Sequence, residues 1–194
     1  MATANTRDHL IEIGLQAMHS TGYASTGVKQ ILDMAGVPKG SFYHYFPSKE
    51  AFTVEVIQRY VANETALREP ILLSSSEPPL QRLRAYFDAQ TAIYERAKTL
   101  CGCLLGNLSI EVADHIPRLQ SVLGETFVYW QGALAAVLSE AEARGELPAS
   151  LKPSETSGFI LNAWEGALVR MKAEQSLEPL RTFRHYIFDI LLKK

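Results

Sequence analysis

The chain has two cysteines, and their thiol groups could act as nucleophiles. Cys101 and Cys103 are the only cysteines in the chain, and one residue separates them. This spacing cannot close the long loop on which a disulfide scaffold depends, so both are expected to be thiols. Cys103 lies where a helix is predicted to begin, and a thiol near a helix N-terminus or a cation becomes a better nucleophile. Cys101 lies outside that helix and is the weaker candidate, and a buried, inert thiol is the alternative for Cys103.

Lys172 is a cation that could accompany this thiol. It ends a helical stripe whose other members are apolar, namely Leu161, Trp164 and Leu168. The pattern therefore predicts that its ammonium lies at the end of a buried face, where it would need a partner. The alternative is that the side chain extends to solvent along its aliphatic stem.

A second group of polar-tipped side chains lies in the run SFYHYF, residues 41–46. Phe42 and Phe46 are four residues apart and can face a core together. Ser41, Tyr43 and His44 then point outward, where a hydroxyl, a phenol or an imidazole can meet DNA phosphates or base edges. Packing of all these rings in a core is the alternative.

The elements that position these residues are helices throughout. Apolar residues recur at helical spacing, and no strand pattern competes with them. Helices are predicted at about 7–20, 27–35, 41–46, 49–72, 79–98, 103–113, 117–144, 154–174 and 178–192. The predicted fold class is therefore all-α.

The first three predicted helices form a helix-turn-helix pattern. Gly22 suits the left-handed conformation that closes the first helix, and Ser25 or Thr26 can cap the second. Pro38 breaks the chain before the short third helix, which is the one that enters the major groove in such an arrangement. Lys39 can hold a phosphate there together with exposed backbone N–H groups.

Composition and sequence patterns bear on three further properties: overall charge, membrane association and metal or cofactor binding. The chain has 194 residues, is 47% hydrophobic and carries a formal net charge of -2, so DNA binding must depend on position and not on bulk charge. It shows neither a membrane span nor the apolar core of a signal peptide, so a cytoplasmic location without a membrane partner is expected. Because no metal-ligand cluster, phosphate-binding loop or acid/base set is apparent, no metal, cofactor or catalytic residue is predicted.

The runs TGVKQI (26–31) and AGVPKGSFYHYFPSKE (35–50) resemble the DNA-binding signature of the TetR/AcrR family. The resemblance implies a homodimer, double-stranded operator DNA as a partner, and release of that DNA when a small-molecule inducer binds the C-terminal part. It places a helix-turn-helix DNA-binding domain at 1–52 and a helical sensor and dimerisation domain at 53–194. It also implies operator contacts, mostly to phosphates, at the matching positions Thr26, Lys29, Lys39, Ser41, Tyr43, His44 and Lys49.

The runs GCLLGNL (102–108), WEGALVRMK (164–172) and LEPL (177–180) are similar to one branch of this family. That branch contains acrylate-responsive repressors and the N-ethylmaleimide-responsive repressor. The resemblance implies that Cys103 and Lys172 form a redox-sensing pair, and that the inducer is an electrophile, an oxidant or a small carboxylate.

Other C-terminal side chains can line a ligand cavity. Trp130 and Trp164 are candidates, as is Asn107, one helical turn beyond Cys103. Core packing of the rings and a surface location of the amide are the alternatives.

A dimer contact is predicted from one helix face. Gly158, Asn162, Gly166 and Arg170 recur every fourth residue, which gives that face small side chains where another helix can approach. With the apolar residues of 178–192, this suits a two-fold contact of four helices. Packing within one chain is the alternative.

Three functions remain open at this point. The leading one is a dimeric repressor that leaves a palindromic operator when a reactive inducer favours another state. In the second, a repressor with the same helix-turn-helix responds to a small carboxylate bound noncovalently by Lys172 or Arg170. In the third, the chain is a thiol-dependent enzyme that uses Cys103, which leaves the helix at 41–46 unexplained.

Overall fold

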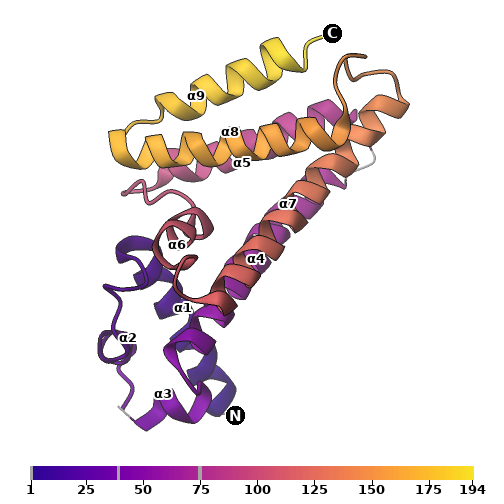
Figure 1. Ribbon diagram of the computed structural model, residues 1–194. Coiled ribbons are helices and arrows are strands. Elements are labelled where there is room, and N and C mark those ends of the chain that lie inside the picture. Colours follow the sequence, from indigo (N-terminus) through magenta and orange to yellow (C-terminus); the bar gives the residue numbers. More distant parts are fainter. Residues whose placement is uncertain (1, 39, 74–75) are drawn as a thin grey trace. The chain divides into compact units, whose positions relative to one another are not determined.

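The computed structural model describes residues 2–38, 40–73 and 76–194, and throughout these ranges the only regular structure is helical. The all-α prediction is thus confirmed. None of the described helices has the length and apolar character that a membrane crossing requires. The elements in chain order (Figure 1) are α1 (Ala2–Thr21), α2 (Val28–Ala35), α3 (Gly40–Tyr45), α4 (Lys49–Leu72), α5 (Pro79–Arg96), α6 (Leu104–Val112), α7 (Pro117–Ala143), α8 (Pro153–Glu174), α9 (Glu178–His185) and the π-helix η1 (Tyr186–Leu191).

The chain divides into two compact units, each built from two segments. The first unit comprises the chain up to Glu64 together with Cys103–Glu125, and the second comprises Thr65–Gly102 and Thr126–Lys194. The first unit thus combines the three N-terminal helices with α4 up to Glu64, with α6 and with α7 up to Glu125. The functional boundary between 1–52 and 53–194 stays a prediction, because compactness groups residues by packing and not by the molecule that they bind.

Phenylalanine side chains form the core beneath α3 in the first unit. Phe42, Phe46 and Phe52 are at most 1% exposed, and their ring centroids lie 4.8 to 5.3 Å apart. Gly14 of α1 lies against Phe52 of α4, where a Cβ atom would come within 2.3 Å of the ring. Any larger residue would push these helices apart, so α3 rests on a closely packed support.

In the second unit α9 packs along α8, and α5 also contacts α9 (Figure 1). Phe87 of α5, Trp164 of α8 and Phe183 of α9 meet with ring centroids 4.9 to 5.1 Å apart. All three are at most 6% exposed, so they form an aromatic core that joins the three helices.

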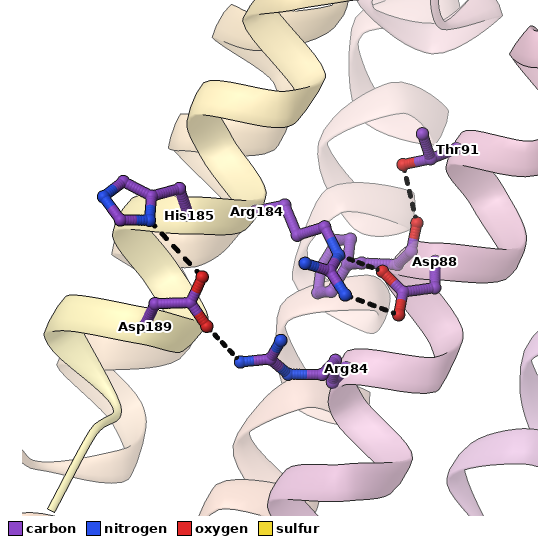
Figure 2. Close-up of polar contacts among 7 residues, drawn as sticks. Arg84, Asp88, Thr91, Arg184, His185 and Asp189 are labelled. Carbon is purple, nitrogen blue, oxygen red and sulfur yellow. Dashed lines mark hydrogen bonds and ion pairs between the residues drawn. The ribbon is translucent and has the colours of Figure 1, made fainter.

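Ion pairs join α5 to α9 and η1 beside this core (Figure 2). Arg184 Nε donates to Asp88 Oδ1 at 2.6 Å, and Arg84 Nη2 donates to Asp189 Oδ1 at 2.5 Å. His185 Nδ1 lies 3.3 Å from the other carboxylate oxygen of Asp189. The hydrogen bond from Arg84 lowers the pKa of the Asp189 carboxyl, and His185 adds to this shift. These contacts orient α9 by turning one of its faces toward α5.

Three local expectations about helix ends are corrected. α1 already begins at Ala2, and the predicted last helix is α-helical only to His185 before it continues as η1. The predicted cap by Ser25 or Thr26 is wrong, because Gly27 is the N-cap of α2 and no side chain caps it. The Thr26 hydroxyl instead donates a hydrogen bond to the carbonyl oxygen of Gly22. Gly22 does adopt the predicted left-handed conformation, with φ of 86°.

Candidate functional site

The outer face of α3 is the part of the helix-turn-helix that reaches solvent. Tyr43 is 65% exposed, His44 is exposed and Ser41 is half-buried. Phe42 and Phe46 face the core, as predicted from their spacing. A helix of six residues is too short to be stable alone, so these two rings hold it in place. The arrangement presents a phenol and an imidazole on a rigid support.

The other predicted DNA contacts differ in exposure. Lys29 is exposed on α2, whereas Lys39 lies outside the described residues. Thr26 is fully buried; its hydroxyl donates to the carbonyl oxygen of Gly22 at 2.6 Å and lies 3.0 Å from the hydroxyl of Thr21. Its side chain therefore stabilises the turn between α1 and α2 and does not face outward.

Lys49, at the start of α4, binds the turn that connects α1 to α2 (residues 22–27, the α1–α2 turn). Its ammonium donates to the carbonyl oxygen of Tyr23 at 2.5 Å and lies 4.1 Å from the centroid of the Tyr23 ring. Burial lowers the pKa of Lys49, and the carboxylate of Glu111 opposes that shift. Burial also raises the pKa of Tyr23, with further contributions from Glu50 and Glu111. The phenol of Tyr23 is therefore neutral at pH 7.

A carboxylate from α6 holds the backbone of the same turn. Glu111 accepts a hydrogen bond from the N–H of Tyr23 at 2.7 Å and another from the N–H of Ala24 at 2.6 Å. Gly22 permits this approach, because a Cβ atom there would lie 2.7 Å from a carboxylate oxygen of Glu111. Hydrogen bonds to a charged acceptor are the strong ones. The C-terminal part of α6 is thus attached to the turn that leads into α2.

Sequence reasoning missed Glu111. Its partners lie 88 and 87 residues away along the chain, so no local pattern reveals the contact. The glycine at position 22 was assigned only a helix-closing role, and it also makes room for this carboxylate.

Cys103 is at the other end of α6, where it is the N-cap residue. The predicted helix started at residue 103, one residue before the observed start at Leu104. The side chain is 5% exposed, and the hydroxyl of Tyr60 lies 3.9 Å from its sulfur. A buried thiol next to a phenol at a helix terminus is accessible only to small reagents or after local opening.

The stripe that Lys172 ends is buried as predicted, and Lys172 itself follows the alternative, in which the side chain extends to solvent. Leu161, Trp164 and Leu168 are buried, but Lys172 is exposed in the last turn of α8. Its stem lies beside Gly102, since a Cβ atom on that glycine would be 3.6 Å from Cδ of the lysine. The aliphatic part packs while the residue stays accessible, as long cationic side chains often do.

Cys101 differs from its neighbour. It is half-buried, and its sulfur lies 3.5 Å from the hydroxyl of Thr99.

Cys103 and Lys172 belong to different compact units, so their pairing stays a prediction.

The remaining sensor candidates have varied surroundings. Trp164 belongs to the aromatic core described above. Trp130 is half-buried, and its ring meets Phe127 edge to face at 5.9 Å. Asn107 is half-buried, and its backbone N–H donates to the carbonyl oxygen of Cys103 at 3.0 Å. Ligand binding by these three residues stays a prediction.

An apolar groove of about 460 Å³ runs between α8 and the α9–η1 segment. Gly166 lies in this groove, and a Cβ placed there would meet no described atom within 4 Å apart from its chain neighbours and the adjacent backbone of α8. Arg170 lines it as well and is paired with Glu174 on the same helix. Contiguous apolar side chains on a surface are typical of contacts between proteins. The most exposed rings and aliphatic chains here are Phe159, Tyr186 and Ile190, each more than half exposed.

Comparison with known families gives two matches that together cover most of the chain. Residues 10–56 match the family described as "Bacterial regulatory proteins, tetR family". Residues 79–187 match the family described as "Tetracyclin repressor-like, C-terminal domain".

Individual relatives match over nearly the whole chain. The transcriptional repressor DhaR of Mycobacterium sp. (strain GP1) is 35% identical, with 99% of this chain and 95% of the relative covered. The transcriptional regulator AcuR of Cereibacter sphaeroides is 36% identical, with 92% and 84% covered. The crystal structure of reduced Escherichia coli NemR superimposes with a TM-score of 0.88 at 31% identity, with 96% and 97% covered.

Proposed function

The chain belongs to the TetR family of ligand-responsive, DNA-binding transcription regulators, and on that premise we propose a dimeric repressor that a small electrophile or oxidant releases from its operator. Members of this family bind operator DNA, usually as dimers. Two of the relatives, DhaR and NemR, are named as repressors. One observation carries the proposal: α6 has Cys103 at its first end, and Glu111 in its last turn binds the α1–α2 turn.

For operator binding, α3 enters the major groove with Tyr43 and His44 toward the DNA. Lys29 and Lys39 contact phosphates, with the half-buried Ser41 at the edge of this surface. Lys49 and Thr26 do not contact DNA in this proposal. Their polar groups bind backbone carbonyl oxygens of the α1–α2 turn and so stabilise the helix-turn-helix. The proposal rests on the exposure of α3 above its buried phenylalanines.

Replacement of Lys39 by alanine tests the phosphate contacts. The variant should bind specific and nonspecific DNA more weakly alike, and the slope of log K against log salt should fall by about one unit. Lys152→Ala is the matched control, because Lys152 is an exposed lysine at the start of α8. Unchanged operator affinity of Lys39→Ala at two salt concentrations would contradict the assignment.

In the proposed sensing reaction, the thiol of Cys103 reacts with the electrophile or oxidant, and Lys172 takes part when the sulfur is oxidised. With N-ethylmaleimide, the thiolate adds to one alkene carbon, the other takes a proton, and a thioether forms. With hypochlorous acid, the thiolate sulfur attacks the chlorine and hydroxide leaves, which gives a sulfenyl chloride. The side-chain nitrogen of Lys172 then displaces chloride and gives up a proton, which forms an S–N bond. The Lys172 stem lies beside Gly102, the residue before Cys103, and this position supports the assignment.

The reaction is transmitted along α6. Cys103 and Glu111 are eight residues apart, which corresponds to about 12 Å at 1.5 Å per residue of helix. A group added to a buried N-cap residue needs space, so the start of α6 must shift or unwind. Glu111 then pulls on the backbone of Tyr23 and Ala24 and changes the orientation of α2 and α3.

Operator release by N-ethylmaleimide, hypochlorite and acrylate tests the sensor. Wild type, Cys101→Ser, Cys103→Ser and Lys172→Ala are compared, and Cys103→Ser is expected to be unresponsive to the first two reagents while Cys101→Ser responds normally. If Cys103→Ser responds like wild type to all three, covalent sensing at this residue is wrong. If it loses only the responses to maleimide and hypochlorite but still releases with acrylate, a noncovalent carboxylate site is favoured.

The dimer forms through the α8–α9 groove. The exposed apolar side chains of this groove and the open space beside Gly166 support the assignment. A two-fold contact here presents two copies of α3 to operator half-sites about one DNA turn, or a multiple of it, apart.

A further inference from the structure

Tyr60 of α4 lies between the Cys103 thiol and α1, and all three belong to the first unit. Its hydroxyl donates to Sγ of Cys103 at 3.9 Å. On its other side, the ring of His19 of α1 meets the Tyr60 ring edge to face, with the centroids 5.8 Å apart. The half-buried phenol is thus packed against α1 while its hydroxyl reaches the residue that begins α6.

The Tyr60 hydroxyl interacts differently with the two forms of this sulfur. A neutral thiol is a weak acceptor, and the long O–S distance of 3.9 Å is typical of such a contact. A thiolate is a charged acceptor, and hydrogen bonds to charged groups are shorter and stronger. A donor that binds the charged form more strongly favours that form. The contact therefore favours ionisation of Cys103.

Burial gives this donor its importance. Cys103 is 5% exposed, and a charge that is withdrawn from water needs compensation by donors or dipoles. The N-terminus of α6 supplies partial positive charge at the position of Cys103. Tyr60 adds a hydroxyl that is directed at the sulfur itself.

The cation next to Tyr60 in the chain serves a different contact. Arg59 is paired through its two terminal nitrogens with Asp8 and Glu12 of α1. Its charge is therefore balanced where α4 meets α1. The phenol of Tyr60 is the group of α4 whose hydrogen bond to the sulfur is observed.

We propose that Tyr60 is a positioning residue for the reaction of Cys103, and that its hydroxyl orients and stabilises the thiolate that attacks the electrophile or the oxidant. The inference rests on the proposed sensing by Cys103. The thiol proton passes to solvent, the phenol keeps its own proton, and the new bond forms at the sulfur. Alkylation turns the sulfur into a neutral thioether, which is again a weak acceptor, so the reaction also weakens the contact between α4 and the start of α6.

The rate of alkylation by iodoacetamide, measured over a range of pH by intact mass spectrometry, tests this role. The full chain carries Cys101→Ser, so that Cys103 is the only thiol and the thiolate displaces iodide at one site. Tyr60→Phe keeps the ring beside His19 and removes only the hydroxyl. It should raise the midpoint of the rate against pH by about 0.5 to 1 unit, as expected for loss of one hydrogen bond. Below the midpoint the rate should fall about 2- to 4-fold, because a less acidic thiol gives a more nucleophilic thiolate and so regains part of the loss.

Two control variants accompany Tyr60→Phe. Tyr129→Phe removes the hydroxyl of an exposed tyrosine on α7 and should change neither the midpoint nor the rate. His19→Phe keeps a ring beside Tyr60 and removes the titratable nitrogens, and it should leave the midpoint where it is. A midpoint that moves in His19→Phe but not in Tyr60→Phe would assign the effect to the imidazole and overturn the proposal.

An unchanged midpoint in Tyr60→Phe would also overturn it, even if the rates at every pH changed by one common factor. A phenol that only packs alters access to the thiol and leaves its ionisation as it was. These rates are measured without DNA, so they separate this inference from the proposed function. If alkylation of Cys103 does not release the operator, sensing by Cys103 is wrong, and a midpoint shift in Tyr60→Phe still supports the role of the phenol.

Discussion

Removal of the Glu111 carboxylate is expected to loosen the α1–α2 turn while α3 stays folded. Glu111→Ala deletes the acceptor of two backbone N–H groups, at Tyr23 and Ala24. The Tyr23 contact is partly buried, and a hydrogen bond to a charged group contributes about 1.5 to 3 kcal/mol. The Ala24 contact is exposed, so water replaces most of it. The local loss is therefore about 2 to 3 kcal/mol.

Hydrogen exchange measures this loss directly. At about 1.4 kcal/mol for each factor of ten, protection of the Tyr23 and Ala24 amides should fall about 30- to 150-fold. Glu111→Gln keeps one acceptor oxygen and should give an intermediate result. Asp114→Ala is the matched control, since Asp114 is an exposed acidic residue just beyond α6. If protection in Glu111→Ala equals that in wild type and in the control, the carboxylate does not hold this turn.

The same variant tests transmission. If Glu111 carries the signal from Cys103, Glu111→Ala should still be alkylated by N-ethylmaleimide, but alkylation should change operator affinity much less than in wild type. A full response to alkylation in this variant would refute the proposed path along α6, and it would leave sensing by Cys103 itself intact.

Two further predictions concern the second unit. Gly166→Leu places a side chain in the α8–α9 groove and should give monomers at micromolar concentration by ultracentrifugation; a variant that is still dimeric would put the interface elsewhere. Because Arg84 lowers the pKa of Asp189, the stabilisation from this carboxylate is complete above the unfolded pKa of about 3.9 and is lost as the pH falls through the lower folded pKa. Asp189→Asn should therefore remove part of the acid sensitivity of unfolding, and an unchanged acid-unfolding curve would contradict this role.

Local periodicity was sufficient to predict most of the fold. The alternation of buried and exposed residues on α3 follows from the spacing of Phe42 and Phe46. The helices α4, α5, α7 and α8 begin and end within two residues of their predicted positions. The π-helical end of the last helix was not predicted, because a hydrophobic pattern of this length does not distinguish the two kinds of turn. The cap of α2 was mistaken because the Thr26 hydroxyl has a competing acceptor behind it.

The site was less predictable, since its important contacts join distant parts of the chain. Lys172 continues an apolar stripe in sequence, but in the last turn of α8 that stripe has reached the surface. Glu111 looks like an ordinary surface residue of a helix, because its role depends on a turn far away in the sequence. Helical periodicity identifies which residues share a face, but it does not identify what that face meets.

The two cysteines illustrate why exposure alone does not identify a sensor. Cys101 is the more accessible thiol, so a rate of alkylation would favour it over Cys103, which is 5% exposed. Cys101 lies in the segment before α6, and a group added there can extend into solvent. The same group added to Cys103 must displace the start of a helix whose last turn binds the α1–α2 turn. On the proposed mechanism the sensing residue is therefore the one whose modification is costly to accommodate, and burial of Cys103 is what makes its reaction change the structure.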